Sequence, residues 1–268
     1  MSATAAHAQA TAGPARPPIR HRKNVYFLSP PQLASLRDAF QAVMDISDNR
    51  GFQFYAGLHG VPGNFCVHHP PPPNISLFLP WHRAYLYFFE LALRDQVPDA
   101  SLAWWDWASP AAHRNGIPRA YREPNVDGNP NPLFQFAIDP QLGGPTETDR
   151  SPGDPAELPT RADVATVLQI QQFNRFSSRL EDLHDAVHGW VGGTMGIIAW
   201  AAYDPIFWAH HTNIDRLWSL WQLSHQPAFP PSFLDQALPP FPMTVRQTLN
   251  TTRLGYDYAS STSHAVRA

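Results

Sequence analysis

The chain has 268 residues, of which 43% are hydrophobic and 15% charged, and its formal net charge is −3. This balance provides neither the basic surface that nucleic-acid binding requires nor the Lys and Arg cluster that an anionic membrane attracts. The length suits one large domain with a sizeable core, and the unusual counts are 13 His, 9 Trp, 29 Pro and a single cysteine, Cys66.

The N-terminal stretch 1–20 is small, polar and proline-containing, and we interpret it as a flexible leader. It lacks the charged start and apolar core of a complete secretory signal. No apolar run approaches the ~18 residues of a membrane span, so we expect a soluble protein without a membrane partner. Cytoplasmic and processed secreted locations both remain open.

Two helices and a segment between them are predicted in the first part of the chain. Ser29 precedes Pro30-Pro31 and then apolar residues at helical period, which indicates an amphipathic core helix. A second segment follows through Phe52, Phe54, Tyr55 and Leu58 to His59-Gly60. The run FLPWHRAYLYFFE (78–90) predicts the second helix, which opens just after Pro80, with His82 in its first turn.

The stretch from Ser109 to about Pro159 is dense in Pro, Gly, Asn and Asp and too long for an ordinary connection. Leu133, Phe134 and Phe136 within it need a surface to pack on. It is therefore predicted to be a folded irregular insertion or a lid, and not a domain linker.

Two histidines stand four residues apart in the next helical segment, which resumes around Ala162. His184 and His188 would share one face with Glu181. Alone this spacing is weak evidence for a metal site. Asp185 follows His184, so the glutamate that a zinc protease of the HExxH type needs as its base is missing.

The segment DPIFWAHHTNIDRLW (204–218) places Phe207, His211, Asp215 and Trp218 on one helical stripe. Burying an imidazole and a carboxylate costs several kcal/mol unless each finds a partner. Either a hydrogen-bonded core pair or a metal ligand with an orienting carboxylate would satisfy that requirement.

Taken together, residues 20–258 resemble the type 3 dicopper family of tyrosinases, catechol oxidases and molluscan hemocyanins. FLPWHRAYLYFFE is similar to the family's copper A signature and DPIFWAHHTNID (204–215) to its copper B signature. HDAVHGWVGG (184–193) and Tyr256-Asp257-Tyr258 add to the resemblance.

The fold expected on this basis is mainly α, with an antiparallel four-helix bundle core that holds a dinuclear copper site. Long irregular proline-rich loops and few short strands would surround the bundle. The domain would span 21–258, followed by a C-terminal tail at 259–268.

The resemblance implies two copper ions, each with three histidine ligands. The copper A ligands would be His59, His68 and His82, and the copper B ligands His184, His188 and His211. His68 is preferred to His69 because it stands two residues after Cys66, where many relatives form a thioether from cysteine to the ligand histidine. His211 is preferred to His210, which would point about 100° away on a helix. The histidines expected on the surface or in loops are His7, His21, His113, His225 and His264.

Further roles follow from the same resemblance. Glu181 occupies the position where several relatives hold a water near copper B, and Asp185 would supply a base or misorient that water. Gly189 leaves the entrance open, and Ile198 resembles a gate above copper A.

Asp215, one turn after His211, is predicted to accept a hydrogen bond from a ligand imidazole. The alternative for Asp215 is a salt bridge with Arg216.

The function implied is a copper-dependent phenol oxidase with dioxygen as co-substrate and a small phenolic or catecholic substrate. Neutral imidazoles suit copper, and three nitrogens per ion leave positions for dioxygen and substrate. It would oxidise o-diphenols to o-quinones and also hydroxylate monophenols at the ortho position. The alternatives are a hemocyanin-like oxygen carrier, an o-aminophenol oxidase and, more distantly, a zinc hydrolase. The carrier is less favoured because hemocyanin units append a β domain, and none is expected after Tyr258.

Overall fold

The computed structural model describes residues 19–68 and 74–258, and in this part helices dominate while strands are short. The expected mainly α fold is confirmed. The leader and the tail lie almost wholly outside the described residues, as do His7, His69 and His264.

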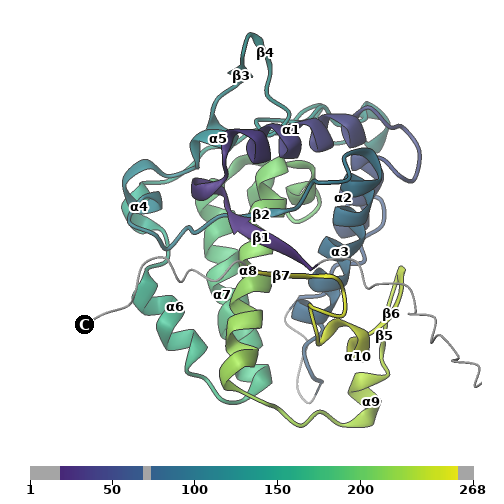
Figure 1. Cartoon of the computed structure of the whole chain (residues 1–268), viewed down its shortest axis with the longest axis vertical. Coiled ribbons are helices and arrows are strands. Elements are labelled where there is room, and N and C mark those ends of the chain that lie inside the picture. The colour runs from purple at the N-terminus through teal and green to yellow at the C-terminus, as the bar shows by residue number, and fades with distance from the viewer. Residues whose placement is uncertain (1–18, 69–73, 259–268) are drawn as a thin grey trace, which may run out of the picture.

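Four helices form the core bundle: α2 (Phe52–His59), α3 (Phe78–Gln96), α7 (Phe173–Val191) and α8 (Pro205–Ser224). In Figure 1, α7 and α8 run side by side through the centre, with α2 and α3 beside them. Most of α8 is buried, and its buried residues include both large apolar side chains and the polar His210, His211 and Asp215. The predicted four-helix core is confirmed.

Helix starts follow local chemistry. α1 (Pro30–Met44) begins after Ser29, whose side chain accepts from the Gln32 amide while the Gln32 side chain accepts from the Ser29 amide. α3 begins at Phe78, two residues before Pro80 and not after it as predicted. Pro80 is tolerated because the first amides of a helix have no partner within the helix.

A small parallel sheet ties the two ends of the described chain together. β1 (Arg20–Asn24) lies between β2 (Ala103–Trp104) and β7 (Tyr256–Tyr258), and it is parallel to both. Its register pairs Arg22 with Tyr258. The Tyr-Asp-Tyr triplet near the C-terminus is therefore held against the first ordered strand.

The other elements are short. Two antiparallel pairs are β3 (Asn125–Val126) with β4 (Asn129–Pro130), and β5 (Ala237–Leu238) with β6 (Phe241–Thr244). The remaining helices are η1 (Val25–Phe27), α4 (Ala112–Asn115), α5 (Arg119–Arg122), η2 (Pro140–Leu142), η3 (Pro155–Glu157), α6 (Arg161–Leu168), η4 (Gly193–Gly196), η5 (Ala201–Tyr203), α9 (Pro231–Leu234) and α10 (Val245–Thr248).

The stretch 109–159 is a folded insertion packed on the bundle. Leu133 is fully buried, and the Phe136 ring lies 4.6 Å from the ring of Phe52 on α2. Arg150 donates to the carboxylate of Asp204, the residue that caps α8, with Nε 2.8 Å from Oδ2. These contacts confirm that the stretch is not a linker.

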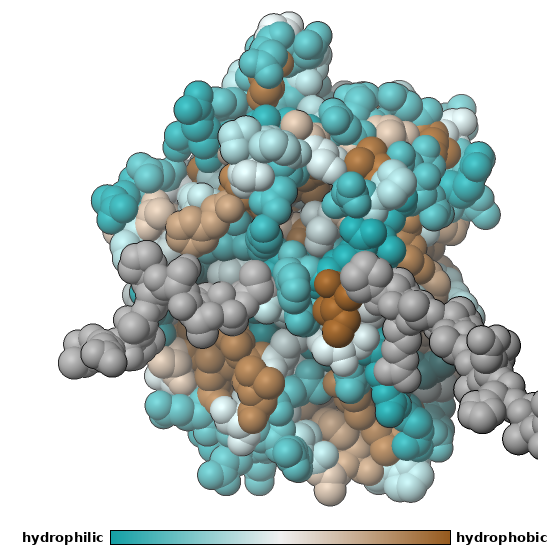
Figure 2. All heavy atoms as spheres, viewed as in Figure 1, coloured by the Kyte–Doolittle hydropathy of each residue, from teal (hydrophilic) through white to brown (hydrophobic). Residues whose placement is uncertain are grey.

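The face in Figure 2 is mostly hydrophilic, with hydrophobic side chains in small separate patches. Among the residues with described positions, none of the helices combines the length and the apolar character that crossing a bilayer requires.

Candidate metal centre

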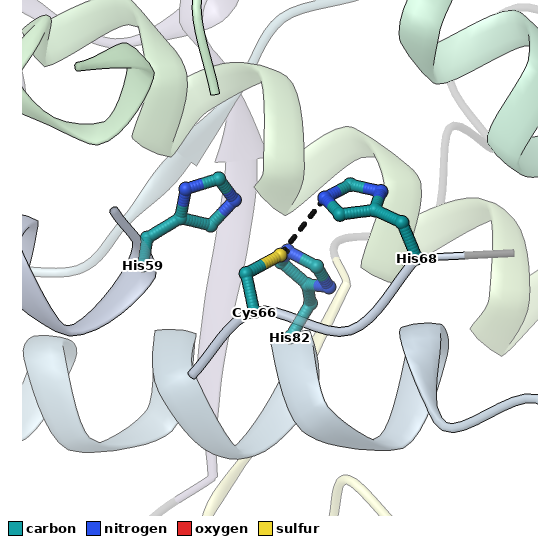
Figure 3. Close-up of side chains that lie close together, drawn as sticks. All are labelled: His59, Cys66, His68 and His82. Carbon is teal, nitrogen blue, oxygen red and sulfur yellow. Dashed lines mark hydrogen bonds between the residues drawn. The ribbon is translucent and has the colours of Figure 1, made fainter. Parts of the chain in front are cut away.

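A first cluster of ligand atoms lies between α2 and α3. His59 ends α2, His82 lies in the first turns of α3, and Cys66 and His68 come from the loop between them. The side chains point toward one another (Figure 3), and one ligand atom from each lies within 4.8 Å of the others. Cys66 Sγ lies 2.9 Å from His68 Nε2 and 3.4 Å from His82 Nε2.

A second cluster lies between α7 and α8. His211 Nε2 on α8 is 3.0 Å from His184 Nε2 and 3.2 Å from His188 Nε2 on α7. The i, i+4 spacing of the α7 pair places both imidazoles toward α8, as predicted. Three nitrogens therefore converge on one point, which is the arrangement that a metal ion with nitrogen ligands requires.

The two clusters adjoin. The rings of His82 and His211 stack with centroids 4.5 Å apart, and the His68 and His184 ring centroids are 5.7 Å apart. The structure thus brings all six predicted ligand histidines into one double cluster. It suits two metal ions side by side.

Four of these imidazoles are held by an acceptor at Nδ1. His82 and His188 donate to backbone carbonyls, and His68 and His184 face carboxylates. Nδ1 of His82 lies 2.8 Å from Phe78 O, and Nδ1 of His188 lies 2.7 Å from Met195 O. Nδ1 of His68 lies 2.9 Å from Glu181 Oε1, and Nδ1 of His184 lies 2.8 Å from Asp185 Oδ1. An acceptor at Nδ1 keeps the proton there, so the Nε2 lone pair faces the cluster and can bind a metal.

Burial keeps the imidazoles neutral. It is the main cause that lowers the pKa of His188 from 6.5 to about 4. Burial, with repulsion from neighbouring imidazoles, also sets the pKa well below 6.5 for His59, His82, His184, His210 and His211. The neutral ring is the form that binds a metal ion.

We expect the metal-free protein to lose stability as pH falls from 6.5 toward 4. Between pH 6.5 and 4, His188 binds a proton in the unfolded chain but not in the folded protein, so acid favours unfolding. Above pH 6.5 His188 is neutral in both states and does not reduce the free energy of unfolding. The effect of this residue is on the order of 3 kcal/mol. Urea midpoints measured from pH 7.5 to 4.5 should fall, and should fall less in His188→Gln. If the urea midpoint falls equally with pH in the wild type and in His188→Gln, the loss of stability does not come from His188.

His210 belongs to the second cluster, which corrects the expectation that it points away. It is fully buried, stacks on His184 at 5.1 Å with an 18° interplanar angle, and meets His188 edge-on at 4.9 Å. One of its nitrogens lies within 4.8 Å of the other ligand atoms of this cluster. α7 packs so closely on α8 that two successive α8 positions both face it.

The predicted role of Asp215 is wrong. Its carboxylate accepts from Arg83 Nε at 2.5 Å, from Arg22 at 3.2 Å and from the Tyr256 hydroxyl at 2.8 Å. None of these is a ligand imidazole, because this side of α8 faces the sheet and α3 and not the clusters.

The alternative for Asp215, a salt bridge with the neighbouring arginine, is also wrong. The guanidinium of Arg216 lies 3.9 Å above the Trp104 ring. The carboxylates that do meet Nδ1 of predicted ligand imidazoles are Glu181, at His68, and Asp185, at His184.

Glu181 links the two clusters. It is fully buried on α7, the helix of His184 and His188, yet its carboxylate meets Nδ1 of His68 in the other cluster. The expected water near copper B stays a prediction. The carboxylate contact was not predicted, because no spacing pattern connects residues that are 113 positions apart.

A cavity of about 240 Å³ opens onto both clusters. Its lining comprises His59, His68, His184, Asp185, His188, Gly189, Met195, Gly196, Ile198 and Ala201. A Cβ at Gly189 would meet nothing within 4 Å, and the Ile198 side chain is 61% exposed. The described lining includes no residue of 109–159, and the lid alternative for that insertion stays a prediction. A larger cavity of about 460 Å³ near Phe54 contacts none of the imidazoles.

The described histidines expected outside the site are indeed elsewhere. His21 pairs with Asp257 on the sheet and has a 58% exposed side chain. His113 Nε2 lies 3.2 Å from the Pro159 carbonyl, and His225 stacks on Trp221 at 4.8 Å.

Comparison with known proteins places this geometry in context. Residues 49–224 match the family model described as the common central domain of tyrosinase. The chain is 36% identical over 185 residues to a tyrosinase from Streptomyces lincolnensis, which covers 58% of this chain and 66% of that protein. It is 32% identical over 220 residues to hemocyanin units G and H from Sepia officinalis, covering 75% of this chain but only 37% of that protein.

Solved structures give the same picture. A functional unit of octopus hemocyanin superposes with a TM-score of 0.75 at 28% identity, covering 89% of this chain and 68% of that one. A tyrosinase from Burkholderia thailandensis has a TM-score of 0.75 at 23% identity, covering 90% and 74%, which shows a shared fold.

Proposed function

The chain belongs to the type 3 dicopper family of tyrosinases and hemocyanins, and on that premise we propose that it is a copper-dependent phenol oxidase. It would use dioxygen to oxidise o-diphenols to o-quinones and would also hydroxylate monophenols at the ortho position. The observation that supports this best is the cavity that opens onto imidazoles of both clusters. Gly189, which has no side chain to narrow the cavity, is part of its lining. An aromatic ring can reach the metal centre through it.

The residues present fit two copper ions. His59 is 2% exposed, and neither of its ring nitrogens has a hydrogen-bond partner among the described residues. Burying such groups is costly unless a metal coordinates them. The six ligands would be His59, His68 and His82 at one ion and His184, His188 and His211 at the other. When bound, two copper ions supply the electrons that reduce dioxygen.

The protein's own part is orientation and proton transfer. Glu181 and Asp185 hold the imidazoles of His68 and His184 in the tautomer that presents Nε2. Asp185 also lines the cavity, where its carboxylate can take the proton of a phenol hydroxyl. Glu181 is the second candidate base, through a water molecule.

We expect Asp185→Asn to lower monophenol hydroxylation relative to o-diphenol oxidation by roughly tenfold or more, because the base is lost. The amide oxygen can still accept from His184 Nδ1, so the imidazole keeps its orientation. The two rates are compared in the copper-loaded wild type and variant. A rise in the ratio would mean that the carboxylate disturbs the water instead, and an unchanged ratio would exclude both roles.

We also expect a thioether between Cys66 and His68 in the copper-matured chain, since Sγ already lies beside the His68 ring. Forming the S–C bond removes two hydrogens, with dioxygen at the copper centre as oxidant. Intact mass should be two hydrogens below the sequence mass, and the unfolded chain should show no reactive thiol. Cys66→Ala and protein matured without copper serve as controls. A full thiol count would contradict the crosslink and leave Cys66 as a small, partly buried side chain.

A panel of monophenols, o-diphenols and o-aminophenols, assayed on the copper-loaded protein, tests the proposed activity. Turnover of an o-diphenol with two copper ions per chain is the expected result. The hemocyanin relatives support a second candidate, an oxygen carrier. Reversible dioxygen binding without turnover of any phenol would overturn the oxidase and favour the carrier. Faster turnover of o-aminophenols would redefine the substrate.

A further inference from the structure

The segment 149–154 of the insertion, which we call the strap, completes the C-terminal end of α7. The last carbonyls of a helix have no partner within the helix itself. Here Ser151 N donates to Val191 O at 3.0 Å. Gly153 N donates to Trp190 O at 2.9 Å. The strap therefore lies along the end of the helix that carries two predicted ligands of the second cluster.

The strap also holds Thr194, which follows α7 by three residues. The Thr194 amide lies 3.0 Å from Asp149 Oδ1 and 3.1 Å from Asp149 O. The Thr194 hydroxyl donates to Asp149 O at 3.0 Å and accepts from Asp149 N at 3.2 Å. Thr194 is 2% exposed, so water does not compete for its side chain. These bonds fix the place of Thr194 relative to the insertion.

The backbone around Thr194 has little stiffness of its own. Gly192 and Gly193 precede it with positive φ, 65° and 53°, and Gly196 ends the same turn, η4. Glycine restricts the backbone less than any other residue. A Cβ at Gly193 would lie 2.4 Å from Asp149 O, so only glycine allows the strap to approach this closely. The position of the turn therefore depends on its contact with the strap.

The residue after Thr194 supports a predicted metal ligand. Met195 O accepts from His188 Nδ1 at 2.7 Å. This acceptor keeps the proton on Nδ1 and leaves the Nε2 lone pair for a metal ion. Met195 is 1% exposed and lines the metal cavity. Because one peptide bond joins Met195 to Thr194, the place of Thr194 determines where this carbonyl lies and how His188 faces His211.

The next residue of the strap is fixed to the other helix of the second cluster. Arg150 Nε lies 2.8 Å from Oδ2 of Asp204, whose side chain also accepts from Ile206 N at the start of α8. Arg150 donates from Nη2 to Leu133 O at 3.2 Å as well. Adjacent strap residues thus contact the turn after α7 and the first turn of α8.

We propose that Asp149 and Thr194 are positioning residues for the metal ion of the second cluster, and that the insertion acts through them to hold His188 in place. This inference deepens the proposed function but rests on the metal centre alone, because an oxygen carrier needs the same ligand geometry. A backbone carbonyl cannot be removed by substitution, so the residues that fix it are the ones to change.

Zinc titration of the full-length protein tests the proposal without turnover, because zinc accepts imidazole ligands and is redox-inert. Thr194→Val removes the hydroxyl at nearly constant shape. One of two zinc ions should then bind roughly tenfold or more weakly, and the other should bind as in the wild type. Thr194→Ser, which restores the hydroxyl, should bind both ions normally.

Asp149 is tested by a second pair of variants. Asp149→Ala removes only the bond to Oδ1 and keeps the backbone bonds to Thr194, so it should weaken the same zinc ion by less than Thr194→Val does. Asp149→Asn keeps an acceptor oxygen at this position and should restore the affinity.

Nitrogen-15 NMR of the imidazoles gives a readout that a general loss of stability does not move. In the metal-free wild type at pH 7.5, His188 should carry its proton on Nδ1. In Thr194→Val, part of the population should carry it on Nε2 instead. Thr248→Val is the matched control, because Thr248 is also buried and its hydroxyl donates to Val245 O at 2.8 Å, away from the cavity lining. It should change neither zinc affinity nor the tautomer.

Three results would overturn the positioning role. They are wild-type affinity for both zinc ions in Thr194→Val, equal weakening of both ions, and a His188 proton that stays wholly on Nδ1. The proposed function is decided separately. If the copper-loaded protein oxidises no catechol, that function fails, and the zinc and NMR measurements still decide this inference.

Discussion

Replacing His211 by alanine is expected to abolish phenol oxidation, by roughly 10³-fold or more, while the protein stays folded. Its Nε2 is the atom on which the second cluster converges, 3.0 Å from His184 Nε2 and 3.2 Å from His188 Nε2. Without it, the copper ion loses one of three ligands and its position opposite the other ion. His82→Ala should have the same effect on the first cluster.

His210→Ala provides the matched comparison, because it removes a neighbouring buried imidazole from the same helix. We expect a much milder loss, about tenfold, since His210 packs on His184 and His188 and thereby orients them. His210 also offers a nitrogen near the cluster, so His211→Ala can retain some copper. Turnover and copper content are therefore measured together, with circular dichroism to verify the fold. If His210→Ala loses copper and His211→Ala remains active, the copper ligand is His210 and not His211.

The ligands could be predicted from the sequence because the chain resembles a known family, and four of them, His82, His184, His188 and His211, lie in the motifs that carry this resemblance. His184 and His188 need only a helix to share a face, and His82 needs only the helix that begins near Pro80. Long, strongly patterned segments of this kind determine their own local structure. The bundle and the double cluster were expected from the family resemblance.

The acceptors behind the ligands could not be predicted in the same way. Two are backbone carbonyls, of Phe78 and Met195, and a carbonyl has no signature in a sequence. Asp215 was misassigned because spacing shows which residues share a helix face, but not which element that face meets. The partners of Asp215 come from β1, α3 and β7, far away in the chain.

The second large effect is expected on stability, at Asp215. This carboxylate lies between Arg22 and Arg83, both 0% exposed, and Arg22 also pairs with Glu90 at 2.9 Å. Two arginines and two carboxylates thus balance each other inside the protein. Burial would raise the pKa of Asp215, but Arg83 and Arg22 outweigh it and set that pKa below its ordinary value. The group is charged in the folded state.

Asp215→Asn leaves one buried positive charge without its counter-charge and should lower the free energy of unfolding by roughly 3–5 kcal/mol. For a domain of this size that corresponds to a fall in Tm of roughly 6–20 °C. Arg83 follows His82 on α3, and Asp215 follows His211 by one turn on α8, so the network also fixes the two helices that carry ligands of both clusters. Copper affinity should fall together with stability.

A charge-matched double variant separates lost charge balance from lost packing. Asp215→Asn with Arg83→Met leaves only the Arg22–Glu90 pair, which is neutral, and should recover part of the stability that Asp215→Asn alone loses. Asp235→Asn is the control, because its pair with Arg246 is exposed and should be worth less than about 1 kcal/mol. Thermal unfolding of five metal-free proteins gives the values: the wild type, Asp215→Asn, Arg83→Met, the double variant and Asp235→Asn. If Asp215→Asn melts with the wild type, or if the double variant is as unstable as the sum of its two changes, the buried charge balance does not hold α3 and α8 together.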